Sequence, residues 1–298
     1  MPRPADPLRV PLRAWTELAR RALAEDRVDT DRTTRAVIPH PVRADARVVA
    51  QATGVLSGVA VAREVLRRGG VRVVSAKRDG TTVRRGDTVL RLRGDARRIL
   101  GVERTVLNVL MHASGVASAT ARTVRAAHGS LRPLGVWATR KTLPGLRDLE
   151  KAAVVHGGGR PHRRDLSDAI LVKNNHLALV PLTEAVRRAR SAARPGERVE
   201  VEVRNALEAV RAARAGADAL LVDNASPRRA RSIVRALEAA GLRRGRWVEL
   251  SGGITPETVA SYRRVGADAV SLGALTHSAP ALPFHLELQP ARLNPRRT

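Results

Sequence analysis

The second half of the chain repeats one pattern, in which a short apolar run is followed by a longer amphipathic segment. Apolar runs of strand length occur at residues 134–138, 168–172, 199–203, 219–223, 247–251 and 269–273. Apolar residues recur every three or four positions in the segments that follow most of them, which predicts helices at about 181–193, 205–215, 226–240 and 255–265. Strands that alternate with helices predict an α/β fold with a parallel sheet, either closed into a barrel or left as an open doubly wound sheet.

The first part of the chain has a different pattern. A helix is predicted over residues 12–25, and residues 45–93 alternate apolar and polar positions in short segments separated by glycines. This alternation is typical of half-buried strands, so a small β-rich unit is predicted there, with one helix around 58–68. A long helical stretch follows at 95–128. With 298 residues, the chain suits one large domain or one large and one small domain.

The charge of the chain is strongly positive. Lysine and arginine number 54 and aspartate and glutamate 28, which gives a formal net charge of +26. Such a charge attracts nucleic acid, anionic membranes or polyanionic small molecules. The arginines are spread along the whole chain, and aromatic residues make up only 2%, so no base-stacking surface is evident. Nucleic acid is therefore a disfavoured partner.

Other chemistries are also excluded or disfavoured by composition. The chain has no cysteine, which excludes disulfides, thiolate metal sites and cysteine nucleophiles. No apolar run approaches the ~18 residues that span a bilayer, and the N-terminus lacks the continuous apolar segment of a secretory signal. The expected location is the cytoplasm, with no membrane partner. Zinc-protease, hydrolase-elbow and Walker-type motifs do not occur.

Four lysines remain among the many arginines, namely Lys77, Lys141, Lys151 and Lys173. Because the chain uses arginine at most basic positions, a lysine suggests a position where a compact charge with an adjustable pKa is needed rather than a planar guanidinium. Lys141 and Lys173 flank a segment, residues 157–164, that is rich in glycine, arginine and histidine. This clustering predicts an anion-binding site.

The predicted strands end in chemically active residues. Parallel barrels place their chemistry at the C-terminal ends of their strands. The residues at these ends are Arg140, Lys141, Lys173, Glu202, Asp223, Ser251, Gly252, Gly253 and Gly273. Cations, two carboxylates and two glycine turns would meet at one edge of the sheet, which favours the barrel over the open sheet.

Two glycine turns follow neighbouring late strands, at Ser251–Gly253 and at Leu272–Ala274. Thr255 and Pro256 would cap and begin the predicted helix that follows the first turn. Backbone N–H groups at such turns bind phosphate well, and late strands hold a phosphate in many barrels. The alternative is a pair of ordinary tight turns; their occurrence together favours a phosphate site.

The acids and the histidine leave alternatives open. Glu202 and Asp223 can hold Mg²⁺, bind ribose hydroxyls or stabilise an oxocarbenium-like positive charge, but an isolated acid can equally pair with a surplus arginine. Glu200 competes with Glu202, because both side chains lie on one face of the same strand. His162 stands beside Arg163 and is read as an anion ligand rather than a structural histidine.

The chain resembles the quinolinate phosphoribosyltransferase family, also called nicotinate-nucleotide pyrophosphorylase (carboxylating). The resemblance covers nearly the whole chain in order. Its motifs are EDRVDTDRTT (25–34), ERTVLNVL (103–110), ASGVAS (113–118), TRKTLPGLR (139–147), EKAAVVHGGGRPHRRDLSDAILVKNNH (150–176), VEVEV (199–203), GADALLVDNASP (216–227), SGGIT (251–255) and GADAVSLGALTHSAP (266–280).

The resemblance implies a fold, an assembly and a reaction. The fold is an N-terminal α/β sandwich, residues 1–115 joined by 280–298, beside an incomplete α/β barrel, residues 116–279, as in type II phosphoribosyltransferases. The assembly is a homodimer with shared active sites, or a larger oligomer. The reaction converts quinolinate and phosphoribosyl pyrophosphate to nicotinate mononucleotide, pyrophosphate and CO2, with Mg²⁺.

The family's site residues carry over onto this chain. Quinolinate would be bound by Thr139, Arg140, Lys141, His162 and Arg163, with Arg104 from the partner subunit. Phosphoribosyl pyrophosphate would be handled by Lys173, Glu202 and Asp223, the last two also being candidate Mg²⁺ ligands, and Lys141, Glu202 and Asp223 are the catalytic candidates. The 5-phosphate would lie on Ser251, Gly252, Gly253, Leu272, Gly273 and Ala274.

Three positions depart from the family pattern. Ala138 and Asn174 stand where the family usually has aspartate, and Pro161 stands where it has asparagine before the histidine. Two acids are missing beside a cationic site, so restoring them is expected to stabilise the ligand-free protein. The alternatives to the family's reaction are a paralogue with another aromatic or nucleotide-like substrate and an arginine-rich nucleic-acid-binding protein.

Overall fold

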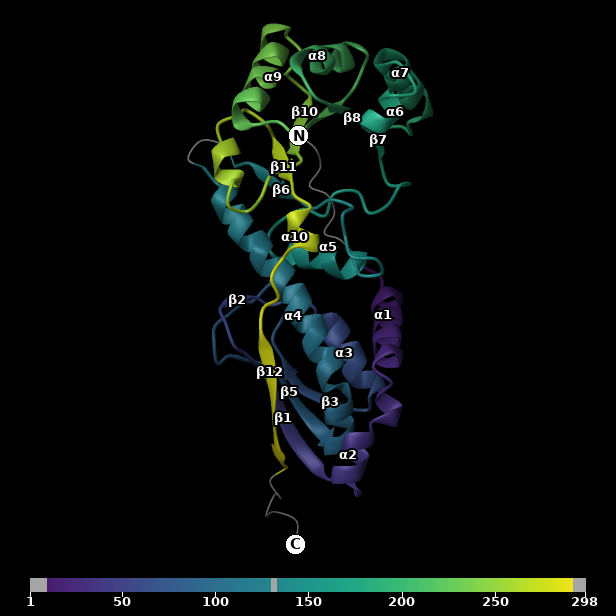
Figure 1. Ribbon diagram of the computed structural model, residues 1–298, viewed down its shortest axis with the longest axis vertical. Coiled ribbons are helices and arrows are strands. Elements are labelled where there is room, and N and C mark those ends of the chain that lie inside the picture. The colour runs from purple at the N-terminus through teal and green to yellow at the C-terminus, as the bar shows by residue number, and fades with distance from the viewer. Residues whose placement is uncertain (1–9, 130–132, 292–298) are drawn as a thin grey trace. The chain divides into compact units, whose positions relative to one another are not determined.

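The computed structural model describes residues 10–129 and 133–291 (Figure 1). The chain divides into two compact units. The first comprises residues 1–121, 143–158 and 279–298, and the second residues 122–142 and 159–278. The predicted barrel, residues 116–279, includes residues 116–121, 143–158 and 279, which belong to the first unit.

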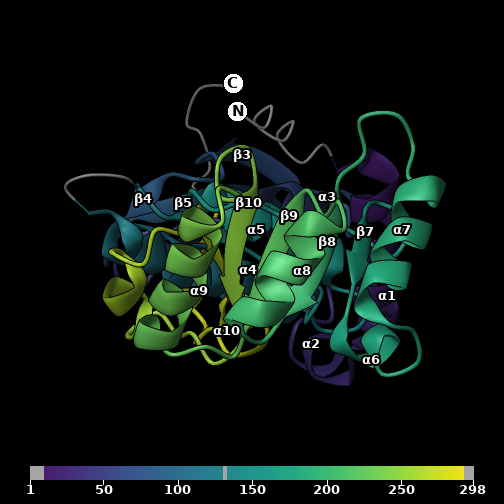
Figure 2. The same ribbon diagram turned by 90° about the horizontal axis from the view of Figure 1, so that it is seen from above.

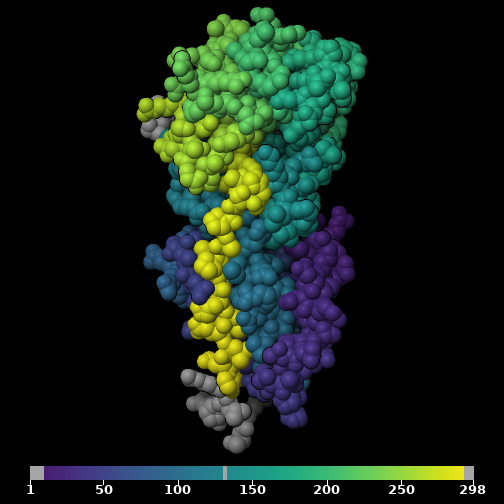
Figure 3. Space-filling view, viewed as in Figure 1, coloured from purple at the N-terminus to yellow at the C-terminus, as the bar shows by residue number. Residues whose placement is uncertain are grey.

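The first unit is built on a four-stranded antiparallel sheet in the order β12-β1-β5-β3. These strands are β1 (Arg43–Ala50), β3 (Arg72–Ala76), β5 (Thr88–Asp95) and β12 (Phe284–Pro290). Alternate residues of β1 and β5 are buried, as their sequence pattern predicts. The C-terminal strand β12, yellow in the space-filling view, lies at the edge of this sheet and is visible along the surface of the unit (Figure 3).

Helices complete the first unit. They are α1 (Leu12–Glu25), α2 (Arg32–Val37), α3 (Val59–Arg68), α5 (Arg147–His156) and the long α4 (Ala96–Ala127), whose C-terminal end belongs to the second unit. A 3₁₀ turn at Val28–Thr30 and a two-stranded ribbon of β2 (Gly54–Val55) and β4 (Thr82–Val83) are also present. The predicted helices at 12–25, 58–68 and 95–128 correspond to α1, α3 and α4.

The second unit contains a six-stranded parallel sheet in the order β6-β11-β10-β9-β8-β7. The strands are β6 (Gly135–Trp137), β7 (Ile170–Val172), β8 (Val199–Val203), β9 (Ala219–Asp223), β10 (Trp247–Ser251) and β11 (Ala269–Ser271). Within the described residues, β6 and β7 are not paired with each other, so the sheet stays open. The predicted incomplete parallel barrel is confirmed.

Three helices cover the outer face of this sheet: α7 (Leu182–Ala192), α8 (Ala206–Arg214) and α9 (Pro227–Ala239) (Figure 2). Val199, Val201 and Val203 of β8 are fully buried, which leaves Glu200 and Glu202 on the opposite, inner face. Local caps start two of the helices. The Asn205 side chain accepts a hydrogen bond from the backbone of α8, and the Ser226 side chain does the same for α9.

One predicted helix is wrong. Residues 255–265 contain only a 3₁₀ turn at Val259–Tyr262. The Thr255 N–H donates to Thr258 Oγ1 at 2.9 Å, and the Thr258 N–H donates to Thr255 Oγ1 at 3.3 Å. These two reciprocal bonds are those of a capping box, with Thr255 as the predicted cap, but the backbone that follows forms only the short 3₁₀ turn. The short helices α6 (Asn174–Leu177) and α10 (Ala274–His277), like α5, were not predicted.

Candidate active site

The strand register of the second unit brings the predicted polar residues to one edge of the sheet. Asp223 of β9 lies opposite Ser251 of β10, and Ser251 lies opposite Ser271 of β11. Glu202 of β8 lies opposite Leu221, two residues before Asp223. The cations and glycine turns lie in the segments that follow β6, β7, β10 and β11. All of these groups are therefore at the C-terminal ends of strands in one sheet, which is where parallel barrels have their active sites.

Two carboxylates face each other at this edge. Burial is the largest influence that raises the pKa of Glu202, followed by the charge of Asp223, while Lys173 acts in the opposite direction. The Asn174 amide donates to Glu202 Oε1 at 2.6 Å, and the Asn224 amide donates to Asp223 Oδ2 at 2.9 Å. The repulsion between the two acids makes the pair suited to a cation.

The donor set fits a hard divalent cation. Glu202 and Asp223 supply carboxylate oxygens, and Asn174 Oδ1 is buried without a hydrogen-bond partner among the described residues. Mg²⁺ prefers oxygen ligands of this kind. These three side chains could therefore hold the metal that the resemblance implies.

Two guanidinium groups repel each other in the same unit. Burial lowers the pKa of Arg163, and the positive charge of Arg140 lowers it further. Nε of Arg140 is buried and has no hydrogen-bond partner in the described part of the chain. Ala138, where the family usually has an acid, is fully buried and offers no charge. A dianionic ligand would relieve the repulsion between these arginines.

Lys141 is held by its backbone and is exposed. Its N–H donates to Thr139 Oγ1 at 3.0 Å, and its carbonyl accepts from Thr276 Oγ1 at 2.7 Å. A Cβ added to Gly273 would lie 2.9 Å from Lys141 Cδ, so the lysine stem passes directly over the second glycine turn. Lys173, after β7, is also exposed. The two lysines singled out from the sequence therefore end in accessible ammonium groups.

The first glycine turn has the backbone of an anion-binding loop. Gly252 and Gly253 have φ angles of 81° and 65°, in the left-handed region. Among the described residues, their N–H groups donate no hydrogen bond. Asn224 approaches so closely that a Cβ on Gly252 would overlap its side-chain amide. Consecutive unpaired N–H groups in a turn form a concave site for phosphate.

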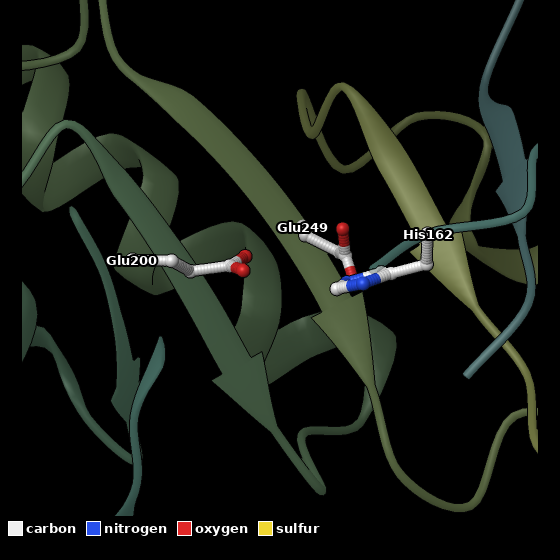
Figure 4. A group of neighbouring side chains, drawn as sticks. All are labelled: His162, Glu200 and Glu249. Atoms are coloured by element: carbon white, nitrogen blue, oxygen red, sulfur yellow. The ribbon is translucent and has the colours of Figure 1, made fainter. Parts of the chain in front are cut away.

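A buried cluster lies on the inner face of the sheet, made of His162, Glu200 and Glu249 (Figure 4). Their ligand atoms are all within 4.8 Å of one another. Burial, and then the charge of Glu249, raises the pKa of Glu200 to about 8. Glu249 was missed by sequence reasoning, although its position two residues before Ser251 in β10 places it on the same inner face.

Arg104, the remaining predicted residue, belongs to the first unit. It is exposed on α4. The other predicted site residues, from Thr139 to Ala274, belong to the second unit.

Two family models match the chain. The model of the quinolinate phosphoribosyl transferase N-terminal domain matches residues 31–114, and that of the C-terminal domain matches residues 116–287. A probable nicotinate-nucleotide pyrophosphorylase [carboxylating] of Methanothermobacter thermautotrophicus is 42% identical over 260 residues, which cover 87% of this chain and 93% of the relative. The nicotinate-nucleotide pyrophosphorylase [carboxylating] of Mycobacterium leprae is 39% identical over 284 residues, covering 92% and 97%.

Solved structures agree. The crystal structure of NadC from Streptococcus pyogenes superposes with a TM-score of 0.86 at 37% identity, covering 96% of this chain and all of that one. Among the described residues, no helix is both long and apolar enough to cross a bilayer. With both of its domains matched and its fold shared along almost the whole length, the chain belongs to the quinolinate phosphoribosyl transferase family.

Proposed function

We propose that this chain transfers the phosphoribosyl group of phosphoribosyl pyrophosphate to quinolinate, with decarboxylation, in NAD biosynthesis. The pyridine nitrogen attacks C1 of the ribose as the bond from C1 to pyrophosphate breaks. The carboxylate at C2 of the ring then leaves as CO2, and C2 takes up a proton. One observation carries the proposal. In a chain of this family, two arginines, Arg140 and Arg163, and two carboxylates, Glu202 and Asp223, lie at or after the strand ends of one sheet.

The cations bind quinolinate. Arg140 and Arg163 neutralise the two ring carboxylates, because these half-buried guanidinium groups repel each other and gain most from a dianion. Thr139 fixes the backbone of Lys141, whose exposed ammonium reaches the same ligand. Charge-assisted hydrogen bonds from several directions orient the ring nitrogen toward the ribose.

The strand ends on the other side of the site handle the phosphoribosyl group. The carboxylates of Glu202 and Asp223 stabilise the positive charge that develops at C1 as pyrophosphate leaves. Lys173, which acts electrostatically on Glu202, pairs with the departing phosphates. The 5-phosphate lies on the turns at Ser251 to Gly253 and at Leu272 to Ala274, where the N–H groups of Gly252, Gly253, Gly273 and Ala274 face it while the Leu272 N–H donates to the Trp137 carbonyl.

Glu202 and Asp223 would hold Mg²⁺, with Asn174 Oδ1 as a further oxygen ligand. When bound, the ion supplies positive charge to the pyrophosphate oxygens. The Asn174 amide keeps Glu202 in place through its hydrogen bond. Titration of the protein with Mg²⁺, followed by calorimetry, tests this assignment against Glu202→Gln, which should bind the ion more weakly.

The protein acts as a homodimer with shared sites, because Arg104 stands in the motif that the family uses across subunits. A mixture of Arg104→Ala and Lys141→Ala protomers, each inactive alone, should regain activity once subunits exchange. No recovery after demonstrated exchange would count against sharing. The cytoplasmic location expected from the sequence stays a prediction, which fractionation of the source cells would test.

The direct test of the reaction is product analysis. Purified protein with quinolinate, phosphoribosyl pyrophosphate and Mg²⁺ should form nicotinate mononucleotide and release one pyrophosphate per turnover. Ala138 and Asn174 favour one competing function, a paralogue that uses another aromatic acid. Formation of a different mononucleotide from a panel of pyridine and benzene carboxylates, with none from quinolinate, would select the paralogue.

A further inference from the structure

The backbone of Lys141 lies beyond the paired strands of the second unit. Strand β6 pairs with β11 as far as Trp137, whose carbonyl accepts from the Leu272 N–H at 3.0 Å. The next residue, Ala138, donates its N–H to the Arg160 carbonyl instead. The hydrogen-bond ladder between β6 and β11 therefore ends before Lys141 is reached, and other bonds must fix the position of this lysine.

Two threonine hydroxyl groups hold the backbone of Lys141. Its N–H donates to Thr139 Oγ1 at 3.0 Å, and its carbonyl accepts from Thr276 Oγ1 at 2.7 Å. In the part of the chain that the structure describes, this carbonyl has no other hydrogen-bond partner. The bond is shielded from water on the threonine side, because Thr276 is only 1% exposed. Removal of the Thr276 hydroxyl would therefore leave the Lys141 carbonyl without its partner.

The Thr276 hydroxyl has one proton and two carbonyl oxygens within reach. Its oxygen lies 2.7 Å from the Lys141 oxygen and 3.0 Å from the Gly273 oxygen. The Gly273 carbonyl already accepts from the backbone N–H groups of Thr276 and His277, at 3.0 and 3.2 Å. Two donors occupy both lone pairs of that carbonyl, and the contact with Lys141 is the shorter one. The hydroxyl proton therefore points to the Lys141 carbonyl.

The second glycine turn also supports the side chain of Lys141. A Cβ added to Gly273 would lie 2.9 Å from Lys141 Cδ and 2.8 Å from His277 Nε2, so the lysine stem and the imidazole occupy the space over the turn. The φ of Gly273 is −67°, which any residue can adopt. The backbone angle does not require glycine here, whereas the lysine stem requires the space. Residues 273–276 therefore contact Lys141 at its carbonyl and at its stem.

We propose that Thr276 is a positioning residue for Lys141, with the second glycine turn as its support. The sequence predicts this turn only as a phosphate-binding loop. The new role rests on the proposed function, in which the Lys141 ammonium contacts quinolinate. The Thr276 hydroxyl fixes the point at which the lysine leaves the backbone, and the bare Cα of Gly273 leaves a path for its stem. The ammonium is directed in this way although the buried Thr276 does not touch the substrate.

Matched substitutions of Thr276 separate its hydroxyl from its shape. Thr276→Ser keeps the hydroxyl, so Kd for quinolinate, measured by calorimetry without the second substrate, should stay within about twofold of wild type. Thr276→Val keeps the branched shape and loses the donor, so Kd should rise about tenfold. Thr120→Val is the control, because the buried Thr120 of α4 donates to the Val116 carbonyl at 2.8 Å. No loss of affinity in Thr276→Val, or an equal loss in Thr276→Ser or Thr120→Val, would overturn the proposal.

Gly273→Ala tests the support of the lysine stem without removing a buried hydroxyl. The added methyl group meets the ends of two side chains rather than the backbone, so the fold should be kept while Kd for quinolinate rises about tenfold. In a Lys141→Ala background, Gly273→Ala and Thr276→Val should each change Kd by less than about twofold, because the side chain that they position is gone. A full further loss of affinity in that background would mean that both residues act by another route, and the proposal would be wrong.

The position of Lys141 can also be read without any substrate. The chain has four lysines, so protein labelled with ¹³C-lysine gives few NMR signals, and those of Lys141 are identified by their absence in Lys141→Arg. Thr276→Val should shift both the carbonyl and the side-chain signals of Lys141, whereas Thr276→Ser and Thr120→Val should leave them near their wild-type positions. A shift of the carbonyl signal alone would contradict the positioning role. This readout does not depend on quinolinate, whose conversion tests the proposed function separately.

Discussion

Asn174 Nδ2 donates a hydrogen bond to Glu202 Oε1 over 2.6 Å. The position at which the family usually has an aspartate therefore holds an amide that supports a carboxylate. From the sequence, an acid restored here was expected to reduce the repulsion between the cationic side chains and so to stabilise the ligand-free protein. The structure indicates the opposite for this position, because the side chain faces Glu202, which Asp223 already repels.

We expect Asn174→Asp to destabilise the ligand-free protein by about 1–3 kcal/mol, since it removes a hydrogen bond to a charged group and adds a third carboxylate. Added Mg²⁺ should raise Tm more in the variant than in wild type, because the ion relieves the new repulsion. Thermal unfolding with and without Mg²⁺ measures both effects. Asn205→Asp is the control, since either residue can cap α8. An equal loss of stability in Asn205→Asp would mean that the effect of Asn174→Asp does not come from Glu202.

Lys141→Ala and Arg163→Ala should each lower kcat/KM for quinolinate by at least about 100-fold, because the loss of one preorganised charge-assisted contact in an active site costs roughly 2.7–4 kcal/mol. Steady-state kinetics with varied quinolinate measure the loss. Lys77→Ala is the control, since Lys77 pairs with Asp87 in the first unit. Kinetics like those of wild type in both site variants would refute the assignment of the quinolinate site.

The two glycines of the first turn should respond differently to alanine. At Gly252 a Cβ would lie 2.9 Å from the Asn224 backbone nitrogen and overlap its side chain, whereas at Gly253 its nearest neighbour is Asn224 Oδ1 at 3.9 Å. Both positions have a left-handed φ, so each alanine costs about 1–2 kcal/mol, but only Gly252→Ala also displaces Asn224. KM for phosphoribosyl pyrophosphate should rise at least about tenfold in Gly252→Ala and clearly less in Gly253→Ala. Equal effects would mean that the approach of Asn224 is unimportant.

Glu64 should stabilise the first unit in a pH-dependent way. Its carboxylate accepts hydrogen bonds from Arg67, Arg68 and Thr16, and Arg67 is the main cause that lowers its pKa from 4.5 to about 2. Below about pH 4.5 the unfolded chain binds this proton before the folded one does, so the contribution is complete above that pH and is lost as pH falls toward 2. Glu64→Gln should lower Tm by a few degrees at pH 7, and the difference from wild type should shrink between pH 5 and 2.

Glu184 provides the comparison for Glu64. It has the same arrangement, with arginines three and four residues later, and its pKa is likewise lowered to about 2. Its side chain is 32% exposed against 8% for Glu64. Solvent screens the exposed pair, so Glu184→Gln should change Tm less. A larger effect at Glu184 would contradict this account of Glu64.

The buried strands could be predicted from the sequence, whereas a helix that buries charged side chains could not. The limits of β8, β9 and β10 could be read from the sequence, because each is a short apolar or alternating run bounded by polar or glycine residues. The helix α5 escaped detection because two of its buried residues, Glu150 and Lys151, are charged and interrupt the apolar pattern of the others. Sequence patterns identify helices by the spacing of apolar residues, which these two charges obscure in α5.

The sequence predicted which side chains follow the C-terminal ends of the strands, but not the hydrogen bonds that those side chains make. Strand-end logic gave Glu202 and Asp223, because the ends of parallel strands share one edge. That Asn174 donates to Glu202 and that the Arg163 N–H donates to His162 Nδ1 depend on side-chain directions that no spacing encodes. Glu249 was overlooked for a related reason, since a single acid inside an apolar strand looks like an exception until its partner is known.

The fate of the quinolinate carboxylates tests the central claim most directly. The protein is incubated with Mg²⁺ and with quinolinate labelled in the carboxylate at ring position 2 or at position 3, and released CO2 is trapped. The account predicts labelled CO2 from the position-2 label only, dependent on phosphoribosyl pyrophosphate and equal in amount to the nicotinate mononucleotide formed. Absence of labelled CO2, from protein shown to be folded and to bind both substrates, would contradict it.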